Sequence, residues 1–311
     1  MAIDKVFYNQ ASQSKLGWEP GWFGAEHNDE ALVEAVRKWQ RKIGIKADGL
    51  VGPMTYRRIW TERQVLISNY EPGQPADSSL EHCKVNNHIV HNGKFYPIEW
   101  HKVVRWDEDG GFGINKGNYY DYSGEEERKP QMFVNHWDVC LSSETCAKIL
   151  NKRGISVHFC IDNDGTIYQI LDTQHGAWHA SSWAGNKRGI GVEISNGYYT
   201  KYQDWYEKNG FGKRPVISKS PIHNTTIRDY LDFYPIQLKA LKALWKACHL
   251  ALDIPLECPT NADGTLCKTV YQDCLDGKFS GFVNHYNFTR GKIDCANLDM
   301  FGLLEDVKND L

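Results

Sequence analysis

The chain has 311 residues, a net charge of −3, and lysine and arginine scattered along its length. It is long enough for one large or two modest domains, and it lacks the basic footprint of a nucleic-acid-binding protein. No apolar run approaches the roughly 20 residues that a membrane-spanning helix needs. The N-terminus lacks a basic segment followed by an apolar one, so we expect no signal peptide and synthesis in the cytoplasm. The nine cysteines, an odd number, are expected to be mostly reduced, buried thiols.

The N-terminal part is predicted to be a small bundle of three helices over residues 1–67. In the segment Asn28–Ile43, apolar residues recur at helical spacing, an Asn-Asp pair can cap the start, and Gly44 follows the last apolar residue. A turn rich in glycine then leads to Pro53, which is well placed at the first position of another helix. Such a bundle is too small for a catalytic cleft of its own.

Residues 68–80 concentrate proline, glycine, serine and asparagine without apolar periodicity, which predicts a linker. A second domain, residues 81–311, follows. Its first strands surround an Asn92-Gly93 hairpin turn, and two nearby histidines at strand spacing point to opposite faces, so we interpret them as structural. Residues 107–130 are rich in glycine, tyrosine and charge, which indicates a long surface excursion.

Beyond residue 130, strand and helix patterns alternate. A strand ends in His136, a helix follows, and a hairpin leads to a further strand and to a long amphipathic helix that begins with proline. The predicted elements are the strand Gln131–Trp137, the helix Ser142–Arg153, the hairpin strands Ile155–Ile161 and Thr166–Leu171, the strand Gly189–Ile194 and the helix Pro235–Leu252.

Five polar residues in this part are candidates for a site. His136 stands at the end of a strand, where site residues often lie, although a lone histidine there is more often structural. Glu193 lies on an apolar strand, where an acid is costly unless it is paired, functional or on a wet face. Near the end, His285 and Asp294 could supply two of the three ligands of a catalytic zinc, and Lys292 could meet developing negative charge. Their spacing alone favours a solvated loop.

The run VRKWQRKIGIKADGLVGPMT resembles the peptidoglycan-binding domain that many cell-wall hydrolases carry at one end. Trp39-Gln40 on the helix and Asp48–Thr55 opening the next helix match that family's pattern in order. The resemblance implies a module of about 65 residues that binds the bacterial cell wall. A helical adaptor with a coincidental DGLVGP turn is the alternative.

The second domain resembles the type 2 zinc N-acetylmuramoyl-L-alanine amidases, relatives of phage lysozymes and peptidoglycan-recognition proteins. The resemblance runs from about Gln131 to Asp299 through SVHFCIDNDGTIYQIL, AWHA, GIGVEISNG and the K-x-D triplet. It implies an α/β fold, with a mixed central sheet flanked by helices. Relative to that family we expect insertions at about 107–130, 196–234 and 255–280.

The resemblance also implies roles for individual residues. A Zn2+ ion would be held by His136, His285 and Asp294, with Cys295 as the second choice for the third ligand. Glu193 would be the catalytic acid and base, and Lys292 would stabilise an oxyanion. The substrate groove would be lined by His158, Trp178 and His179, although two of these, the histidines, could instead pack beneath it.

Cys140 and Cys146 share the C-x5-C spacing of a disulfide in peptidoglycan-recognition proteins. In a chain made in the cytoplasm they could equally stay reduced.

By resemblance, the bond cut is the amide between the lactyl group of N-acetylmuramic acid and L-alanine of the stem peptide of peptidoglycan. A wall-binding module without a signal peptide resembles a phage endolysin, a bacteriolytic enzyme that acts at the cell wall after release. We expect a monomer. The alternatives are an inactive peptidoglycan-recognition protein, and a bacterial autolysin or wall-recycling amidase. A glycosidase would need two carboxylates flanking a cleft, and the sequence offers no clear pair.

Overall fold

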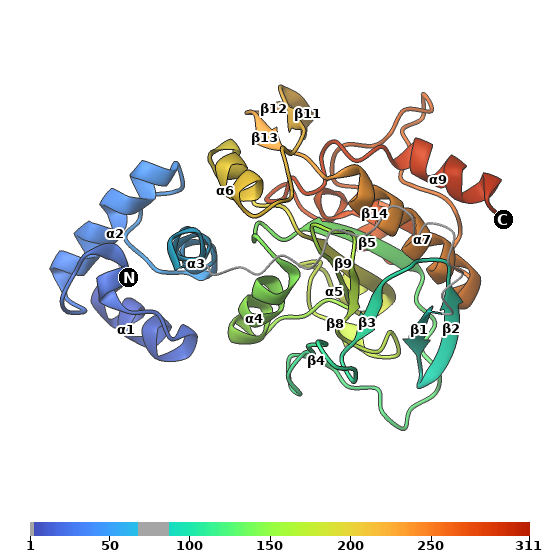
Figure 1. Cartoon of the computed structure of the whole chain (residues 1–311), viewed down its shortest axis with the longest axis horizontal. Coiled ribbons are helices and arrows are strands. Elements are labelled where there is room, and N and C mark those ends of the chain that lie inside the picture. The colour runs from blue at the N-terminus through green and yellow to red at the C-terminus, as the bar shows by residue number, and fades with distance from the viewer. Residues whose placement is uncertain (1–2, 68–86) are drawn as a thin grey trace. The chain divides into compact units, whose positions relative to one another are not determined.

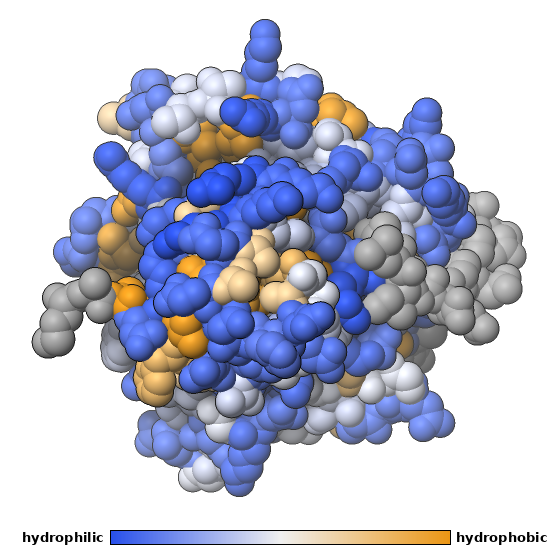
Figure 2. Space-filling model, turned by 90° about the vertical axis from the view of Figure 1, so that its left-hand side faces the viewer, coloured by the Kyte–Doolittle hydropathy of each residue, from blue (hydrophilic) through white to orange (hydrophobic). Residues whose placement is uncertain are grey.

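The computed structural model describes residues 3–67 and 87–311 and divides the chain into two compact units, residues 1–69 and 70–311 (Figure 1). The expected linker, residues 68–80, lies outside the described residues. Within the described parts, no helix is long and apolar enough to cross a membrane. The face drawn in Figure 2 is mostly hydrophilic, with apolar residues in small separate groups.

The first unit is helical, as the sequence predicts. Asp29 caps its second helix by accepting a hydrogen bond from the N–H of Leu32 at 3.1 Å, and Gly44 ends that helix in the left-handed conformation, with φ 75°. The third helix begins at Pro53. The elements are α1 Lys5–Leu16, the 3-10 helix η1 Pro20–Phe23, α2 Glu30–Ile43 and α3 Pro53–Ile67.

The motif that carries the peptidoglycan-binding resemblance has a structural role in this unit. The buried amide of Gln40 donates to the carbonyl of Leu50 at 3.1 Å and to Thr55 Oγ1 at 3.0 Å, and its oxygen accepts from the N–H of Gly49 at 2.8 Å. Gly49 has φ 78°, and a Cβ there would lie 2.7 Å from Cγ1 of Val33. The glutamine and the glycine therefore fix the turn between α2 and α3.

The second unit is built on a six-stranded mixed sheet with the order β14-β5-β9-β6-β7-β3. The first four strands are mutually parallel, β6 and β7 form an antiparallel hairpin, and β3 pairs parallel with β7. The expected mixed α/β fold is confirmed. In sheet order the strands are β14 Gly281–Asn284, β5 Met132–Trp137, β9 Gly189–Ile194, β6 Phe159–Ile161, β7 Ile167–Gln169 and β3 Val103–Arg105.

Helices cover both faces of this sheet (Figure 1). On one face, Trp245 packs against Phe133 and Phe282, with ring centroids 6.3 and 4.6 Å apart. On the other face, Val134 packs in a separate cluster with Ala184. Because side chains alternate along a strand, this places His136 on the face of Val134. The helices of the first face are α7 Pro235–Leu252 and α9 Met300–Asn309, and those of the second are α4 Ser143–Arg153 and α5 Trp183–Arg188.

The remaining elements are short and surround the sheet. They are β1 Asn87–His91 with β2 Lys94–Ile98, β4 Tyr119–Tyr120 with β8 Gly176–Ala177, β10 Val216–Ile217 with β13 Tyr230–Leu231, β11 Ser220–Ile222 with β12 Thr225–Ile227, the helices α6 Gln203–Lys208 and α8 Gln272–Leu275, and the 3-10 helices η3 Thr200–Tyr202 and η4 His285–Asn287.

The predicted surface excursion, residues 107–130, returns to the sheet at its end. The guanidinium of Arg128 donates to the carbonyls of Lys187, Thr173 and Gly189 at 2.8, 2.7 and 2.7 Å. Burial lowers the pKa of Arg128 to about 10, so the side chain stays charged at neutral pH. The prediction of a surface segment is therefore incomplete. Through Arg128, the end of this segment helps to hold β9 in place.

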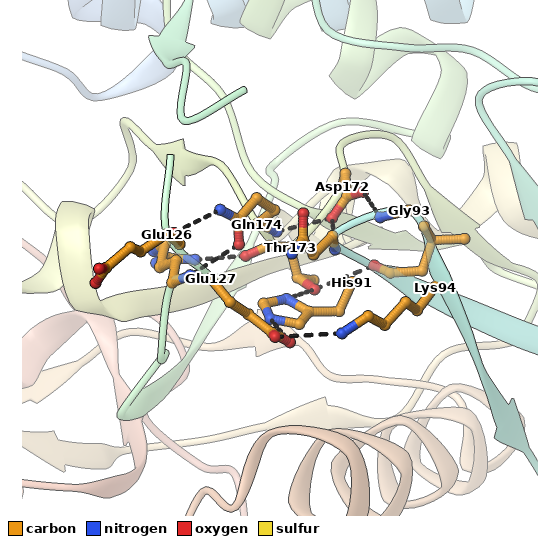
Figure 3. A network of polar contacts seen from close by, with 11 residues as sticks. His91, Gly93, Lys94, Glu126, Glu127, Asp172, Thr173 and Gln174 are labelled. Atoms are coloured by element: carbon orange, nitrogen blue, oxygen red, sulfur yellow. Dashed lines mark hydrogen bonds and ion pairs between the residues drawn. The ribbon is translucent and has the colours of Figure 1, made fainter. Parts of the chain in front are cut away.

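Figure 3 shows a polar network around Asp172, Thr173 and Gln174 that reaches the β1–β2 hairpin. The carboxylate of Asp172 accepts the backbone N–H groups of Asn92 and Gly93, both at 2.9 Å. His91 is buried, and its Nδ1 lies 2.9 Å from Oγ1 of Thr173. This contact holds the hairpin to the segment after β7, which supports the interpretation of His91 as structural.

We predict that Arg128→Met will destabilise the second unit by roughly 2–4 kcal/mol, because three carbonyls lose a charged donor. The midpoint of urea unfolding, followed by tryptophan fluorescence, measures the change. Lys94→Met is the matched control: this exposed lysine of the same network contacts Glu127 at 3.3 Å, and its loss should cost less than about 0.5 kcal/mol. Equal midpoints for Arg128→Met and the parent chain would contradict the structural role.

Candidate metal centre and its surroundings

Three parallel strands bring the candidate residues to one edge of the sheet. His136 lies near the carboxyl end of β5, and its register partner on β9 is Glu193. His285 directly follows β14, which pairs with the other side of β5. Because parallel strands all end at the same edge, residues far apart in sequence meet there. Partners in register point to the same face, so the imidazole of His136 and the carboxylate of Glu193 share the α5 side of the sheet.

Two imidazoles and one carboxylate converge at this edge. Nδ1 of His136 lies 2.8 Å from Nδ1 of His285 and 3.2 Å from Oδ2 of Asp294. The distance from Nδ1 of His285 to the same oxygen is 2.9 Å. All three side chains are buried. The structure thus assembles the three residues that the resemblance assigns as zinc ligands.

The donor set and its spacing fit a zinc ion. Ligand atoms on a tetrahedral zinc, at about 2.0–2.1 Å from the metal, lie about 3.3 Å apart, and the three atoms here are only a few tenths of an ångström closer. Two nitrogens and one oxygen are the donors that catalytic zinc sites use. Nε2 of His285 is buried and neither accepts nor donates a hydrogen bond. Nδ1 is therefore the atom of this ring that lies next to the other ligands.

The charge states of the ligands suit metal binding. Burial and the neighbouring His285 lower the pKa of His136 to about 4, so this ring is neutral at pH 7. Burial opposes the ionisation of Asp294, but the neighbouring His285 and the charge of Lys292 hold the pKa of this carboxyl well below its usual range. A neutral imidazole and a carboxylate are the forms that bind metals.

His179 supports the first ligand from behind. Its Nδ1 lies 2.9 Å from Nε2 of His136, and a proton on that Nε2 leaves the lone pair of Nδ1 facing the other ligands. A Cβ on Gly191 would lie 3.0 Å from three atoms of the His179 ring, so the ring uses the space that the glycine leaves. Asn186 Oδ1 accepts the N–H groups of His179 and Ala180 at 2.9 and 2.7 Å, which ties the segment to α5.

Sequence reasoning missed Asn186 and Gly191, and it expected His179 to line the groove. The sequence held a weak signal for both residues, because Asn186 and Gly191 lie in the loop and the strand that follow the AWHA run. Nothing in the sequence indicates that the ring of His179 packs against β9 at Gly191.

His158 and Trp178 lie further from the ligands. His158 is fully buried, its Nδ1 accepts the N–H of Gly191 at 3.0 Å, and its Nε2 donates to the carbonyl of His175 at 3.0 Å. With both nitrogens engaged, the packing alternative fits this residue better than contact with substrate. Trp178 is partly buried, and its ring packs edge-on against Tyr120 at 5.4 Å.

Cys295 lies away from the ligand atoms, in the core on the other face of the sheet. Burial, with nearby Asp294 and Glu193, raises the pKa of Cys295 well above its ordinary value. A protonated, fully buried thiol is a poor metal ligand. The geometry favours Asp294 over Cys295 as the third ligand.

A second group of side chains with metal-binding atoms contains Asp138, Cys140 and Cys146. The carboxylate of Asp138 already accepts the N–H groups of Cys140 and Asn196 at 2.8 and 3.0 Å and the hydroxyl of Ser195 at 3.1 Å. It is therefore satisfied as a structural residue. Both cysteines are buried free thiols in the structure.

The sequence profile of a family described as N-acetylmuramoyl-L-alanine amidase matches residues 126–259. Residues 126–259 of this chain are thus similar to the type 2 amidases. These enzymes are hydrolases, and their substrate is peptidoglycan. The match contains His136 and Glu193, whereas His285, Lys292 and Asp294 lie beyond its end and join the site through β14.

Solved structures similar to this one include a mutant endolysin from Bacillus subtilis, with 17% sequence identity, a TM-score of 0.40 and coverage of 67% of this chain and 99% of that one. The N-acetylmuramoyl-L-alanine amidase endolysin LysCS from Clostridium intestinale has 16% identity, a TM-score of 0.36 and coverage of 67% and 95%. The Staphylococcus aureus hydrolase AmiA has 13% identity, a TM-score of 0.39 and coverage of 67% and 83%. No curated protein matches the sequence.

We predict that His179→Ala will weaken the affinity of the amidase domain for Zn2+ about 10–100-fold, because His136 loses the partner that fixes its tautomer and orientation. Titration against a fluorescent zinc chelator measures the affinity. The control is His88→Ala, which removes a partly buried histidine of β1 whose ring lies edge-on to Phe95. The zinc affinity of this variant should equal that of the parent chain. An unchanged affinity in His179→Ala would contradict the supporting role.

Proposed function

We propose that this protein is a zinc-dependent N-acetylmuramoyl-L-alanine amidase that hydrolyses the amide between N-acetylmuramic acid and L-alanine of peptidoglycan. The supporting observation is the convergence of Nδ1 of His136, Nδ1 of His285 and Oδ2 of Asp294 within 3.2 Å of one another, beside the strand that carries Glu193. A ligand set of this kind, with an acid at hand, is suited to hydrolysis of an amide by an activated water.

The proposed mechanism assigns one task to each residue. Zn2+, when bound by the two histidines and Asp294, lowers the pKa of water toward about 7 and polarises a carbonyl. Glu193 acts as general base toward the attacking water and then as general acid toward the leaving amine. Lys292 carries the positive charge that stabilises the oxyanion of the tetrahedral intermediate. In support of this, Lys292 is near enough to the ligands to lower the pKa of both His136 and Asp294.

We propose that Trp178 and His179 form the base of the substrate groove. Both are partly buried and belong to the segment that leads from β8 to α5. His158 is fully buried, and the centroid of its ring lies 6.3 Å from that of His179.

We further propose that the helical bundle predicted over residues 1–67 binds the cell wall. We also propose that the protein is a monomeric endolysin acting at the wall after release from the cytoplasm. The basis is the ordered match of Gln40 and the turn after it to the wall-binding pattern. A bacterial autolysin is the competing setting, and the chemistry at the site is the same in both.

The decisive experiment is digestion of purified peptidoglycan with and without a zinc chelator, followed by mass analysis of the fragments. We expect new free amines of L-alanine, loss of activity with the chelator, and recovery on adding Zn2+. New reducing sugars would indicate a glycosidase instead. Binding to the wall without any cleavage, from a chain that contains zinc, would indicate an inactive recognition protein.

We predict that Glu193→Gln will lower kcat about 10²–10⁴-fold while zinc content stays unchanged, because the variant loses the proton acceptor but keeps all three ligands. Release of L-alanine amines and elemental analysis give the two values. Glu144→Gln is the control: this glutamate pairs with Lys148 on the surface of α4 and should retain full activity. Full turnover by Glu193→Gln would exclude this residue as the base.

A further inference from the structure

The segment between β9 and α7 holds a hairpin whose turn contacts the loop of the metal centre. Strands β11 and β12 pair through Ile222 and Thr225, and the two turn residues, His223 and Asn224, have φ of 50° and 61°. Positive φ at both positions is the two-residue turn that suits the twist of a hairpin. Ile222 and Ile227 are buried in the main core, so the base of the turn is anchored.

His223 connects this turn to two other segments. Its backbone N–H donates to the carbonyl of Lys268 at 3.0 Å, and its Nδ1 lies 3.1 Å from Oγ1 of Thr269. Its Nε2 lies 2.7 Å from the carbonyl of Lys292. Because a carbonyl only accepts, Nε2 carries a proton, and in the neutral ring Nδ1 then accepts from the threonine hydroxyl. A single neutral tautomer satisfies both partners.

The loop that receives this hydrogen bond carries most of the site. It begins at His285, contains Lys292 and ends at Asp294, and the N–H of Tyr286 closes it by donating to the carbonyl of Asp294 at 3.3 Å. The His223 ring also lies edge-on to Tyr286, with centroids 6.3 Å apart. The hairpin therefore touches the loop beside its first ligand and two residues before its last.

We propose that His223 is a positioning residue that fixes the backbone at Lys292 and thereby holds its ammonium group where the oxyanion forms. This inference rests on the proposed function, and it gives the segment between β9 and α7 a task in the reaction. A group that must meet a developing charge loses much of its effect when it is displaced by about 1 Å. In the zinc-loaded chain the three ligands would be joined through the shared ion, so their positions would depend less on the hairpin.

The test uses the full chain with zinc and compares His223→Ala, His223→Gln, Lys292→Ala and the double variant His223→Ala/Lys292→Ala. We expect His223→Ala to lower kcat roughly 10-fold with little change in KM. The glutamine variant keeps an N–H for the carbonyl and an acceptor for Thr269, and it should recover most of the loss. In the Lys292→Ala background, the further change to His223→Ala should have no effect, because both act through one group.

Two measurements that do not depend on turnover complete the test. Zinc affinity of His223→Ala should stay within about 3-fold of the parent chain, and hydrogen exchange of the peptide around Lys292 should become faster. The control is His249→Ala, which removes a half-buried histidine from α7 that contacts the carbonyl of Ile254 at 2.8 Å, the same kind of contact at another place. It should change neither kcat nor the exchange at Lys292.

The outcomes separate the two proposals. If the parent chain with zinc releases no L-alanine amines, the proposed function fails. If the parent chain is active and His223→Ala has the same kcat, the positioning role fails and the proposed function stands. The same conclusion follows if the kcat losses of His223→Ala and Lys292→Ala multiply in the double variant. A large loss of zinc affinity in His223→Ala would also overturn it, because the hairpin would then act on the ligands.

Discussion

The site depends on the parallel pairing of β5 with β14 on one side and with β9 on the other. This backbone ladder sets His136 opposite Glu193 and starts His285 at the same edge. A shift of register by one residue would turn His136 to the opposite face of the sheet. The alternation of Phe133 and Val134 between two separate apolar clusters opposes such a shift. Packing far from the chemistry thus determines where the ligands meet.

A second constraint is that buried polar groups need partners. The ligand imidazole of His136 is backed by His179, and Gly191 both leaves space for that ring and donates its N–H to His158. Arg128 holds the carbonyl of Gly189 at the start of the same strand. The strand of the proposed acid is therefore held at Gly189 and Gly191 by polar contacts from two different segments.

The first unit illustrates a difference between a motif and a ligand site. Gln40, Gly49 and Thr55, which carry the wall-binding resemblance, are used to close the turn between two helices. A pattern of this kind identifies a fold, because the backbone requires those residues. Residues that would contact the wall can vary without changing the pattern.

The sequence by itself determined the elements with strong local signals: α2 with its Asp29 cap, α7 from its first proline, and the hairpin turn at Asn92-Gly93. It also supplied two ligand candidates by residue type, His285 and Asp294, whereas the full ligand set came only through resemblance to a family. Tertiary structure alone decided that Asp294 faces the imidazoles while Cys295 lies in the core, and that Arg128 and His223 reach distant carbonyls. The reason is physical: propensity and periodicity act over a few residues, whereas these contacts join segments that only the folded sheet brings together.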